Sequence, residues 1–147
     1  TPKFLELFIG IDIDYKKLEV CIKKHSYLTS KKILNLEEEY NMFIEFYNGI
    51  LLDYNYPNYT RKIAEQIAYN RTYEYDKYNL YENVKEELYK LKEKYILILL
   101  SDNWPCGIEF LKFYNIHDVF DKIYISSIYG QEKQDKEFFD NPISDFY

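Results

Sequence analysis

The chain has 147 residues, of which 47% are hydrophobic, and 19 Lys and Arg against 25 Asp and Glu give a formal net charge of −6. This length favours one domain, or one core with a small insertion. The acidic balance argues against a general binder of nucleic acid or anionic membranes, which needs a concentrated basic face.

Two further observations bear on the compartment. The longest apolar run, residues 95–100, is far shorter than the roughly 20 residues of a membrane span. The chain opens with no charged-then-apolar leader, and Cys21 and Cys106 lie far apart without a CxxC context. We therefore expect a cytoplasmic protein with two reduced thiols and no membrane contact.

Helical periodicity dominates the first 80 residues. Residues 1–10 predict a short helix, with proline at the first helical position and glycine at the end. Asp14 can cap a second helix, in which Leu18 and Ile22 are spaced four apart along one face.

Two more helices are predicted in this half. Residues 36–52 carry apolar side chains at spacings of three and four, and the carboxylates of Glu37–Glu39 suit the dipole at the start of that helix. Thr60 can cap the next helix, which carries Ile63 and Ile67. The first half therefore predicts a small helical bundle.

After residue 80 the pattern alternates between helix and strand. An apolar stripe over residues 84–95 predicts a helix, and the continuous apolar run 95–100 predicts a strand covered on both faces. A helix ending near Asn115, a strand at 122–126 and a short helix at 137–140 follow. This order, with its short connections, predicts part of an α/β doubly wound sheet with parallel strands.

Polar residues follow both predicted strands. Ser101 comes directly after the first strand, and the loop 129–133, which ends in Lys133, comes after the second. Ligands bind beyond the carboxyl ends of such strands, and a hydroxyl with an ammonium group suits an oxyanion such as phosphate. The same positions are also compatible with plainer roles, a turn or capping serine and a solvated lysine.

Four segments carry a more specific pattern. Residues 83–94 form an apolar-striped helix before the strand, and 96–103 (ILILLSDN) are an apolar strand ending in serine. Residues 120–127 (FDKIYISS) fit F-D-x-I-x-x-S, and 130–139 (GQEKQDKEFF) fit G-x-x-K-P-D-x-x-I-F, with Gln134 replacing the proline. In this order the segments resemble the haloacid dehalogenase-like (HAD) hydrolases, especially the phosphatase-type subfamily with a helical cap.

The resemblance implies hydrolysis of a phosphoryl group through an aspartyl-phosphate, with Mg²⁺ screening the charge. Ser101 would donate a hydrogen bond to a phosphoryl oxygen, and Lys133 would offset negative charge. Asp102 stands where the family more often has Asn, and Asn103 would contact the substrate beside it. The implied substrate is a small phosphorylated metabolite such as a sugar phosphate; dehalogenation of a 2-haloacid is the less common activity of the family.

Two motifs of the family are missing from this pattern. The only candidate for the first motif, residues 8–14, has the D-x-D spacing but Lys16 where Thr or Val belongs, and it is better interpreted as the entry of the cap, with Asp14 as a helix cap. The fourth motif, paired aspartates that bind Mg²⁺, has no counterpart, so the metal ligands are not assigned. We expect a helical cap at residues 1–80 and half of a Rossmann-like HAD core at 81–147, as an interior portion of a longer enzyme.

One alternative of a different class stays open. If the acidic site is absent altogether, the chain is a non-catalytic helical interaction protein that keeps a degenerate HAD-like fold. His25 and His117 lack a second His, Cys or acidic partner at metal spacing, so surface or capping roles are expected for both. The sequence leaves the oligomeric state undecided.

Overall fold

The computed structural model describes residues 12–144 and divides the chain into two compact units. Unit 1 contains residues 12–31 and Leu36–Glu74, and unit 2 contains Lys32–Asn35 and the chain from Tyr75 onward. Among the described residues there are seven α-helices and one two-stranded parallel sheet. The expectation of a mixed α/β chain with parallel strands is thereby confirmed. The helix predicted for residues 1–10 lies outside the described residues.

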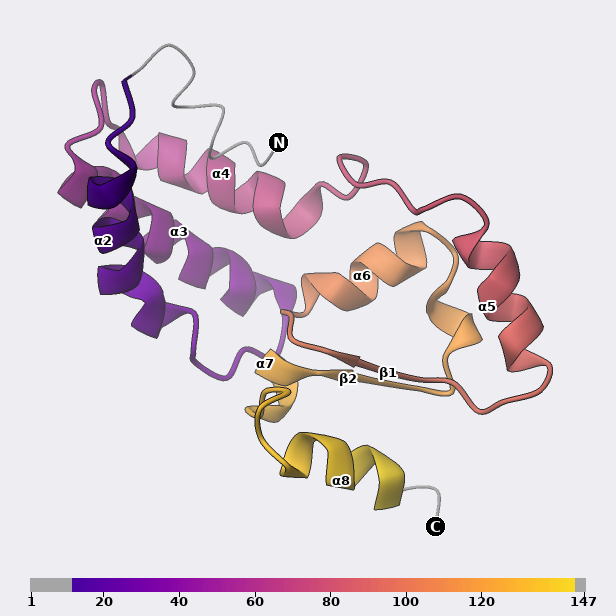
Figure 1. The fold of residues 1–147 in the computed structure, drawn as a ribbon. Coiled ribbons are helices and arrows are strands. Elements are labelled where there is room, and N and C mark those ends of the chain that lie inside the picture. Colours follow the sequence, from indigo (N-terminus) through magenta and orange to yellow (C-terminus); the bar gives the residue numbers. More distant parts are fainter. Residues whose placement is uncertain (1–11, 145–147) are drawn as a thin grey trace. The chain divides into compact units, whose positions relative to one another are not determined.

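Unit 1 is entirely helical in its described part. It contains α2 (Tyr15–His25), the 3₁₀ turn η1 (Ser26–Leu28), α3 (Leu36–Tyr54) and α4 (Arg61–Tyr73) (Figure 1). Asp14 caps α2 as predicted, because its Oδ1 accepts the Lys17 N–H at 3.0 Å. Thr60 occupies the capping position of α4 in an extended conformation, although its side chain makes no capping hydrogen bond.

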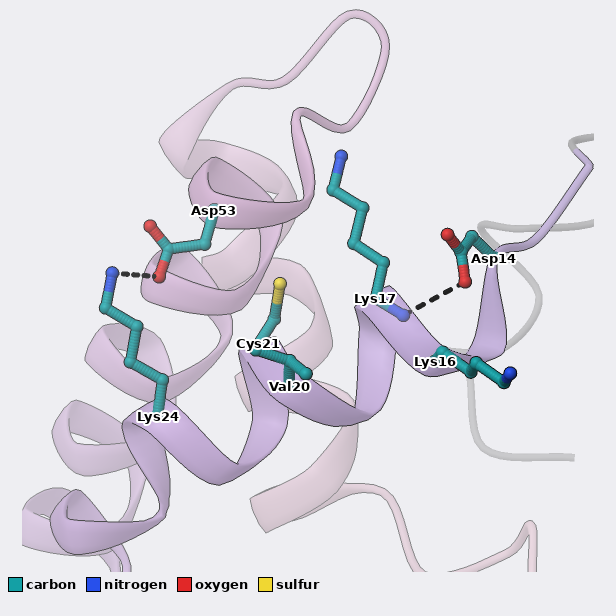
Figure 2. A pocket seen from close by; sticks show the side chains of 7 residues that line it. All are labelled: Asp14, Lys16, Lys17, Val20, Cys21, Lys24 and Asp53. Carbon is teal, nitrogen blue, oxygen red and sulfur yellow. Dashed lines mark hydrogen bonds and ion pairs between the residues drawn. The ribbon is translucent and has the colours of Figure 1, made fainter.

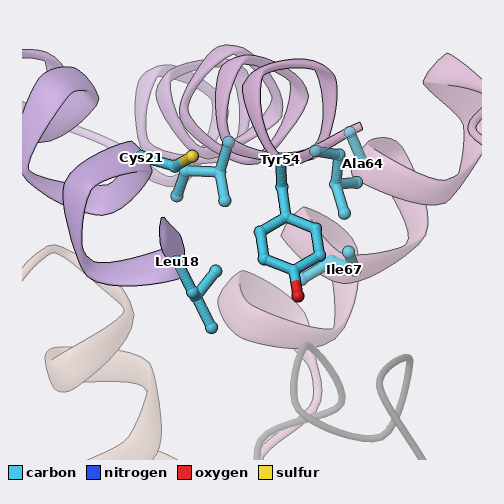
Figure 3. Close-up of a cluster of buried hydrophobic side chains, with 7 residues drawn as sticks. Leu18, Cys21, Tyr54, Ala64 and Ile67 are labelled. Atoms are coloured by element: carbon cyan, nitrogen blue, oxygen red, sulfur yellow. The ribbon is translucent and has the colours of Figure 1, made fainter. Parts of the chain in front are cut away.

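The core of unit 1 lies where these three helices meet. Figure 3 shows the cluster of Leu18, Cys21, Ile50, Leu51, Tyr54, Ala64 and Ile67. The prediction that Ile22 shares the buried face with Leu18 is wrong, since Ile22 is 36% exposed whereas Cys21 is 4% exposed. The buried face of α2 passes through Leu18, Cys21 and His25, at spacings of three and four.

The last turn of α2 depends on a glycine in α3. A Cβ added at Gly49 would lie 2.4 Å from Cε1 of His25, so the imidazole occupies the space that a side chain there would need. The ring is held by Asp53, whose Oδ2 is 2.8 Å from His25 Nε2. Of the surface or capping roles expected from the sequence, the surface role is wrong for His25, since its ring packs between α2 and α3 at the end of α2.

Unit 2 builds the parallel sheet and its covering helices. Its elements are α5 (Val84–Lys92), β1 (Ile98–Ser101), α6 (Cys106–Phe113), η2 (His117–Val119), β2 (Lys122–Ile125), α7 (Ser126–Tyr129) and α8 (Glu137–Ser144) (Figure 1). The two strands pair in parallel from Ile98 opposite Lys122 to Ser101 opposite Ile125. Both strands therefore end at the same edge, which is where a ligand is expected.

The first strand is shorter than predicted. Tyr95 and Ile96 are 62% and 61% exposed, and β1 begins only at Ile98. The Tyr95 N–H donates to the Leu91 carbonyl at 2.9 Å, so the last turn of α5 takes the backbone group that a strand would need. The expectation of a strand covered on both faces over 95–100 is wrong for its first half, and the remaining residues are half-buried.

A second apolar cluster lies beneath the sheet of unit 2. Leu111, Ile116 and Val119 are buried and pack against half-buried side chains of α5, α6 and both strands, among them Leu88, Leu97, Leu99, Phe110 and Ile123. This packing places α5 and α6 on one face of the strand pair.

Candidate functional site

The candidate site is the edge at which β1 and β2 end together. Ser101 is the last residue of β1 and pairs with Ile125, the last residue of β2. The next residues along the chain, Asp102 and Asn103 on one side and Ser126 on the other, therefore lie beyond the same edge. The two chain segments that the sequence singled out for oxyanion binding start from neighbouring points.

Hydrogen bonds join the two segments immediately beyond the strands. The Asn103 N–H donates to Ser126 Oγ at 3.1 Å, and the Ser126 hydroxyl lies 3.3 Å from the Asn103 carbonyl, which it can reach as a donor. The Ser127 N–H donates to the same carbonyl at 3.2 Å. The backbone at Asn103 is thus fixed against the start of α7.

The Asn103 side chain is turned toward α6. Its Oδ1 accepts the Trp104 N–H at 2.9 Å, and a Cβ added at Gly107 would lie 2.9 Å from its Nδ2. Gly107, in the first turn of α6, leaves the space that this amide occupies. The structure therefore gives Asn103 a local role in starting α6, and its predicted substrate contact stays a prediction.

Lys133 reaches the same edge from a distant part of the chain. Its backbone N–H donates to Asp102 Oδ1 at 2.9 Å, across 31 residues of sequence. The loop that carries Lys133 is therefore attached directly beside Ser101. This contact also gives Asp102 a physical role: one carboxylate oxygen orients the Lys133 loop, a bond that the amide oxygen of the more usual asparagine could also accept.

Negative charge surrounds Lys133. The Glu132 N–H donates to Asp135 Oδ2 at 2.8 Å, and Gln134 Nε2 donates to Glu132 Oε2 at 2.8 Å. Gln134, which replaces the expected proline, thus ties the loop by a side-chain hydrogen bond where a proline ring would stiffen it. The exposed carboxylates around this loop would repel an anion unless a cation offsets them.

The residues needed to hold Mg²⁺ are not found together. Across residues 12–144 the structure contains no group of three His, Cys, Asp or Glu side chains that could hold a metal ion. Asp14, from the first-motif candidate, is used as the cap of α2, and residues 8–11 of that candidate lie outside the described part. The described carboxylates therefore do not fit the implied ion, and we derive no reaction step through it.

A pocket of about 490 Å³ lies elsewhere, between α2 and α3 of unit 1 (Figure 2). It is lined by Asp14, Lys16, Lys17, Val20, Cys21, Lys24 and Asp53. Lys24 pairs with Asp53 at 2.7 Å, and Lys17 Nζ donates to the Tyr54 carbonyl at 2.6 Å. Burial, followed by the nearby Asp53 charge, raises the pKa of the Cys21 thiol, which disfavours a reactive thiolate. The side chains of Lys17, Lys24 and Asp53 in this pocket thus make structural contacts within unit 1.

The contacts of Asp53 are expected to make unit 1 less stable at low pH. Hydrogen bonds from Lys24 and then His25 hold the pKa of Asp53 below its ordinary value of 3.8. A lowered carboxyl pKa stabilises the fold above the unfolded value and loses that contribution as the pH falls through the folded value. We expect the urea midpoint of unit 1, monitored through the exchange of α3 amides, to decrease when the pH is lowered below about 4. In Asp53→Asn we expect a smaller decrease. An equal acid response in both proteins would contradict this.

Comparisons with known proteins found no match. No family model matches the chain, and neither a curated protein nor a solved structure matches it. Within residues 12–144, none of the helices combines the length and the apolar character needed to cross a bilayer.

The sequence missed some residues that shape the edge. It pointed to Ser101, Asp102, Asn103 and Lys133, but it did not anticipate that Ser126 joins the two segments or that Ile33 contacts Ser127. The serine of the F-D-x-I-x-x-S segment could have signalled the first contact. The second contact is made by backbone atoms, and no residue type announces it.

Proposed function

We propose that the carboxyl edge of β1 and β2 binds the phosphoryl group of a small phosphorylated metabolite, as part of a HAD-like hydrolase. The observation that carries the proposal is the hydrogen bond from the Lys133 N–H to Asp102, which joins two of the segments that resemble the HAD hydrolases, residues 96–103 and 130–139. The parallel register of Ser101 with Ile125 supports it, because ligands of α/β sheets bind at this edge.

Each residue has a distinct part in this proposal. The Ser101 hydroxyl donates a hydrogen bond to one phosphoryl oxygen, and the Lys133 ammonium group balances the charge of the others. Asp102 keeps the Lys133 loop at the edge through its carboxylate. These residues bind and orient the phosphoryl group; the attacking aspartate and Mg²⁺ belong to the proposal through the resemblance alone.

The charge around the site makes binding depend on a cation. Asp102 and Glu132 are exposed near Lys133 and Asp135 is half-buried, so a phosphate dianion meets both attraction and repulsion. A divalent cation beside the phosphate would reduce that repulsion. Since no group of described side chains can hold such an ion alone, the cation would have to come with the phosphate, and in that form we expect Mg²⁺ to strengthen the binding of phosphate by this edge.

The proposal is tested first by binding and then by catalysis. The ¹⁵N-labelled chain is titrated with inorganic phosphate, with and without Mg²⁺, and we expect saturable amide shifts at Asp102, Asn103 and Lys133. The pocket of unit 1, which Lys16, Lys17 and Lys24 line, serves as the internal control: the amide of Val20 in its wall is expected to stay unchanged. Shifts confined to unit 1, or no saturable shift anywhere, would contradict the proposal.

Catalysis is assayed on the complete gene product with p-nitrophenyl phosphate and Mg²⁺. Hydrolysis that is lost on removal of Mg²⁺ supports a phosphohydrolase. Phosphate binding without hydrolysis by a verified complete protein would instead favour the non-catalytic interaction protein, which keeps the fold and the anion site but not the reaction.

A further inference from the structure

A short segment of unit 2 lies in the sequence between helices of unit 1. Residues Lys32–Asn35 connect η1 to α3, yet they belong to unit 2. We call Lys32–Asn35 the strap. Ile33, within it, is only 6% exposed, and its backbone N–H donates to the Ser127 carbonyl at 3.0 Å.

The end of α7 explains why Ser127 accepts this bond. α7 has four residues and stops at Gly130, which takes a left-handed conformation with φ of 72°. The N–H groups of Gly130 and Gln131 both turn back to the Ser126 carbonyl, at 2.8 and 3.3 Å. The last carbonyls of a helix need donors from elsewhere, and the strap supplies one at Ser127.

A second contact places the strap along the same turn. A Cβ added at Gly130 would lie 3.8 Å from Cδ of Lys32, an ordinary van der Waals distance. The alkyl chain of Lys32 therefore lies beside the residue that ends α7, while the Ile33 backbone holds Ser127. The strap contacts both ends of this turn.

The turn in question leads directly into the candidate site. Ser127 is bonded on its other side to the Asn103 carbonyl, and the loop that begins there ends at Lys133, which is bonded to Asp102. The loop 126–133 is thus attached at both ends to the residues that follow β1. Among the contacts named here between described residues, those of the strap come from before residue 100.

We propose that the strap is a positioning segment: the Ile33 N–H fixes the Ser127 peptide and thereby orders the loop that presents Lys133. The consequence for phosphate rests on the proposed function, whereas the ordering of the loop does not. In this arrangement the connection that precedes α3 sets how well the edge of unit 2 is organised for an anion. Ile33 touches no substrate and acts through Ser127.

The test removes one N–H and measures two quantities. Ile33→Pro deletes the donor, whereas Ile33→Val keeps it, and Lys31→Pro places a proline at an exposed position just outside the strap. We expect the Lys133 and Ser127 amides to exchange with solvent about two to twelve times faster in Ile33→Pro, the range that corresponds to one ordinary hydrogen bond. In Ile33→Val and Lys31→Pro we expect less than about a twofold change, as no hydrogen bond is removed. We expect phosphate affinity to decrease in Ile33→Pro and to stay close to that of the unaltered chain in Ile33→Val and Lys31→Pro.

The outcomes separate this inference from the proposed function. If the Lys133 amide exchanges faster in Ile33→Pro but the unaltered chain binds no phosphate, the positioning role of the strap is supported and the proposed function is refuted. Unchanged exchange at Lys133 in Ile33→Pro overturns the strap, whatever phosphate does. If Ile33→Pro fails to fold, exchange in the unaltered protein decides: the amides of Ile33, Ser127 and Lys133 should open together in low urea, and independent opening of Ile33 would refute the inference.

Discussion

Gly49→Ala is expected to destabilise unit 1 by about 1–3 kcal/mol, the usual cost of inserting a group into filled space. The new Cβ would lie 2.4 Å from the His25 ring, so the imidazole must leave its place and lose its 2.8 Å contact with Asp53. In an open helix the same change would be stabilising, because alanine is favoured over glycine by about 1 kcal/mol. The free energy of unfolding is measured in urea, with α3 amide exchange or circular dichroism as the signal.

The double variant decides whether the ring is the cause. In a His25→Ala background the clash is absent, so Gly49→Ala is expected to change sign and to stabilise unit 1 by up to about 1 kcal/mol. The two substitutions are thus coupled by about 1–4 kcal/mol, above the usual error of additivity for distant sites. Additive effects of the two changes would show that the helices rearrange around Gly49 and that His25 does not fill the space.

Local rules predicted the parts of the fold that depend on neighbours in sequence. Asp14 caps α2 because an aspartate before an amphipathic stretch can accept the N–H of the third following residue. The apolar runs before Ser101 and Ser126 predicted the parallel strands, since short continuous apolar runs are typical of such strands. In the cap the side chain and the backbone group that it serves lie within one turn.

The errors arose where a distant or competing group decided the outcome. Tyr95 was assigned to the strand by its apolar character, but its N–H completes the last turn of α5. Ile22 has the spacing of a core residue, but the helix face is set by His25, which needs the gap at Gly49. Neither the competition for one N–H nor the space left by one glycine can be read from periodicity.

In the candidate site, too, the sequence predicted some features and missed those that depend on contacts between distant residues. Order along the chain was enough to bring Ser101 and the Lys133 loop to one edge, because parallel strands that end in register impose it. How the loop is held was not predictable, since it depends on Asp102 accepting a backbone N–H and on Ile33 reaching Ser127. Backbone donors carry no sequence signature, so these contacts became visible only in three dimensions.

The Ser101→Ala, Lys133→Ala double variant is expected to weaken phosphate binding about 100-fold or more. A hydrogen bond to a charged group contributes about 1.5–3 kcal/mol, so removal of the Ser101 donor alone should cost at least about tenfold in affinity. Loss of the Lys133 ammonium group leaves the carboxylates of Asp102, Glu132 and Asp135 unbalanced, and a comparable loss of affinity is expected. The backbone N–H of residue 133 survives the substitution, so its bond to Asp102 should persist.

Lys136→Ala is the matched control, because it removes one positive charge from the same region while Lys136 makes only a long, exposed ion pair with Asp140 at 3.8 Å. Affinities are measured by the phosphate titration at fixed salt, with the Lys133 amide shift as a check that the loop stays attached. A control that weakens binding as much as Lys133→Ala would show that general charge, and not this edge, attracts phosphate. If the double variant bound phosphate with unchanged affinity, neither the Ser101 nor the Lys133 side chain would contribute to binding, and the role that the resemblance implies for them would be refuted.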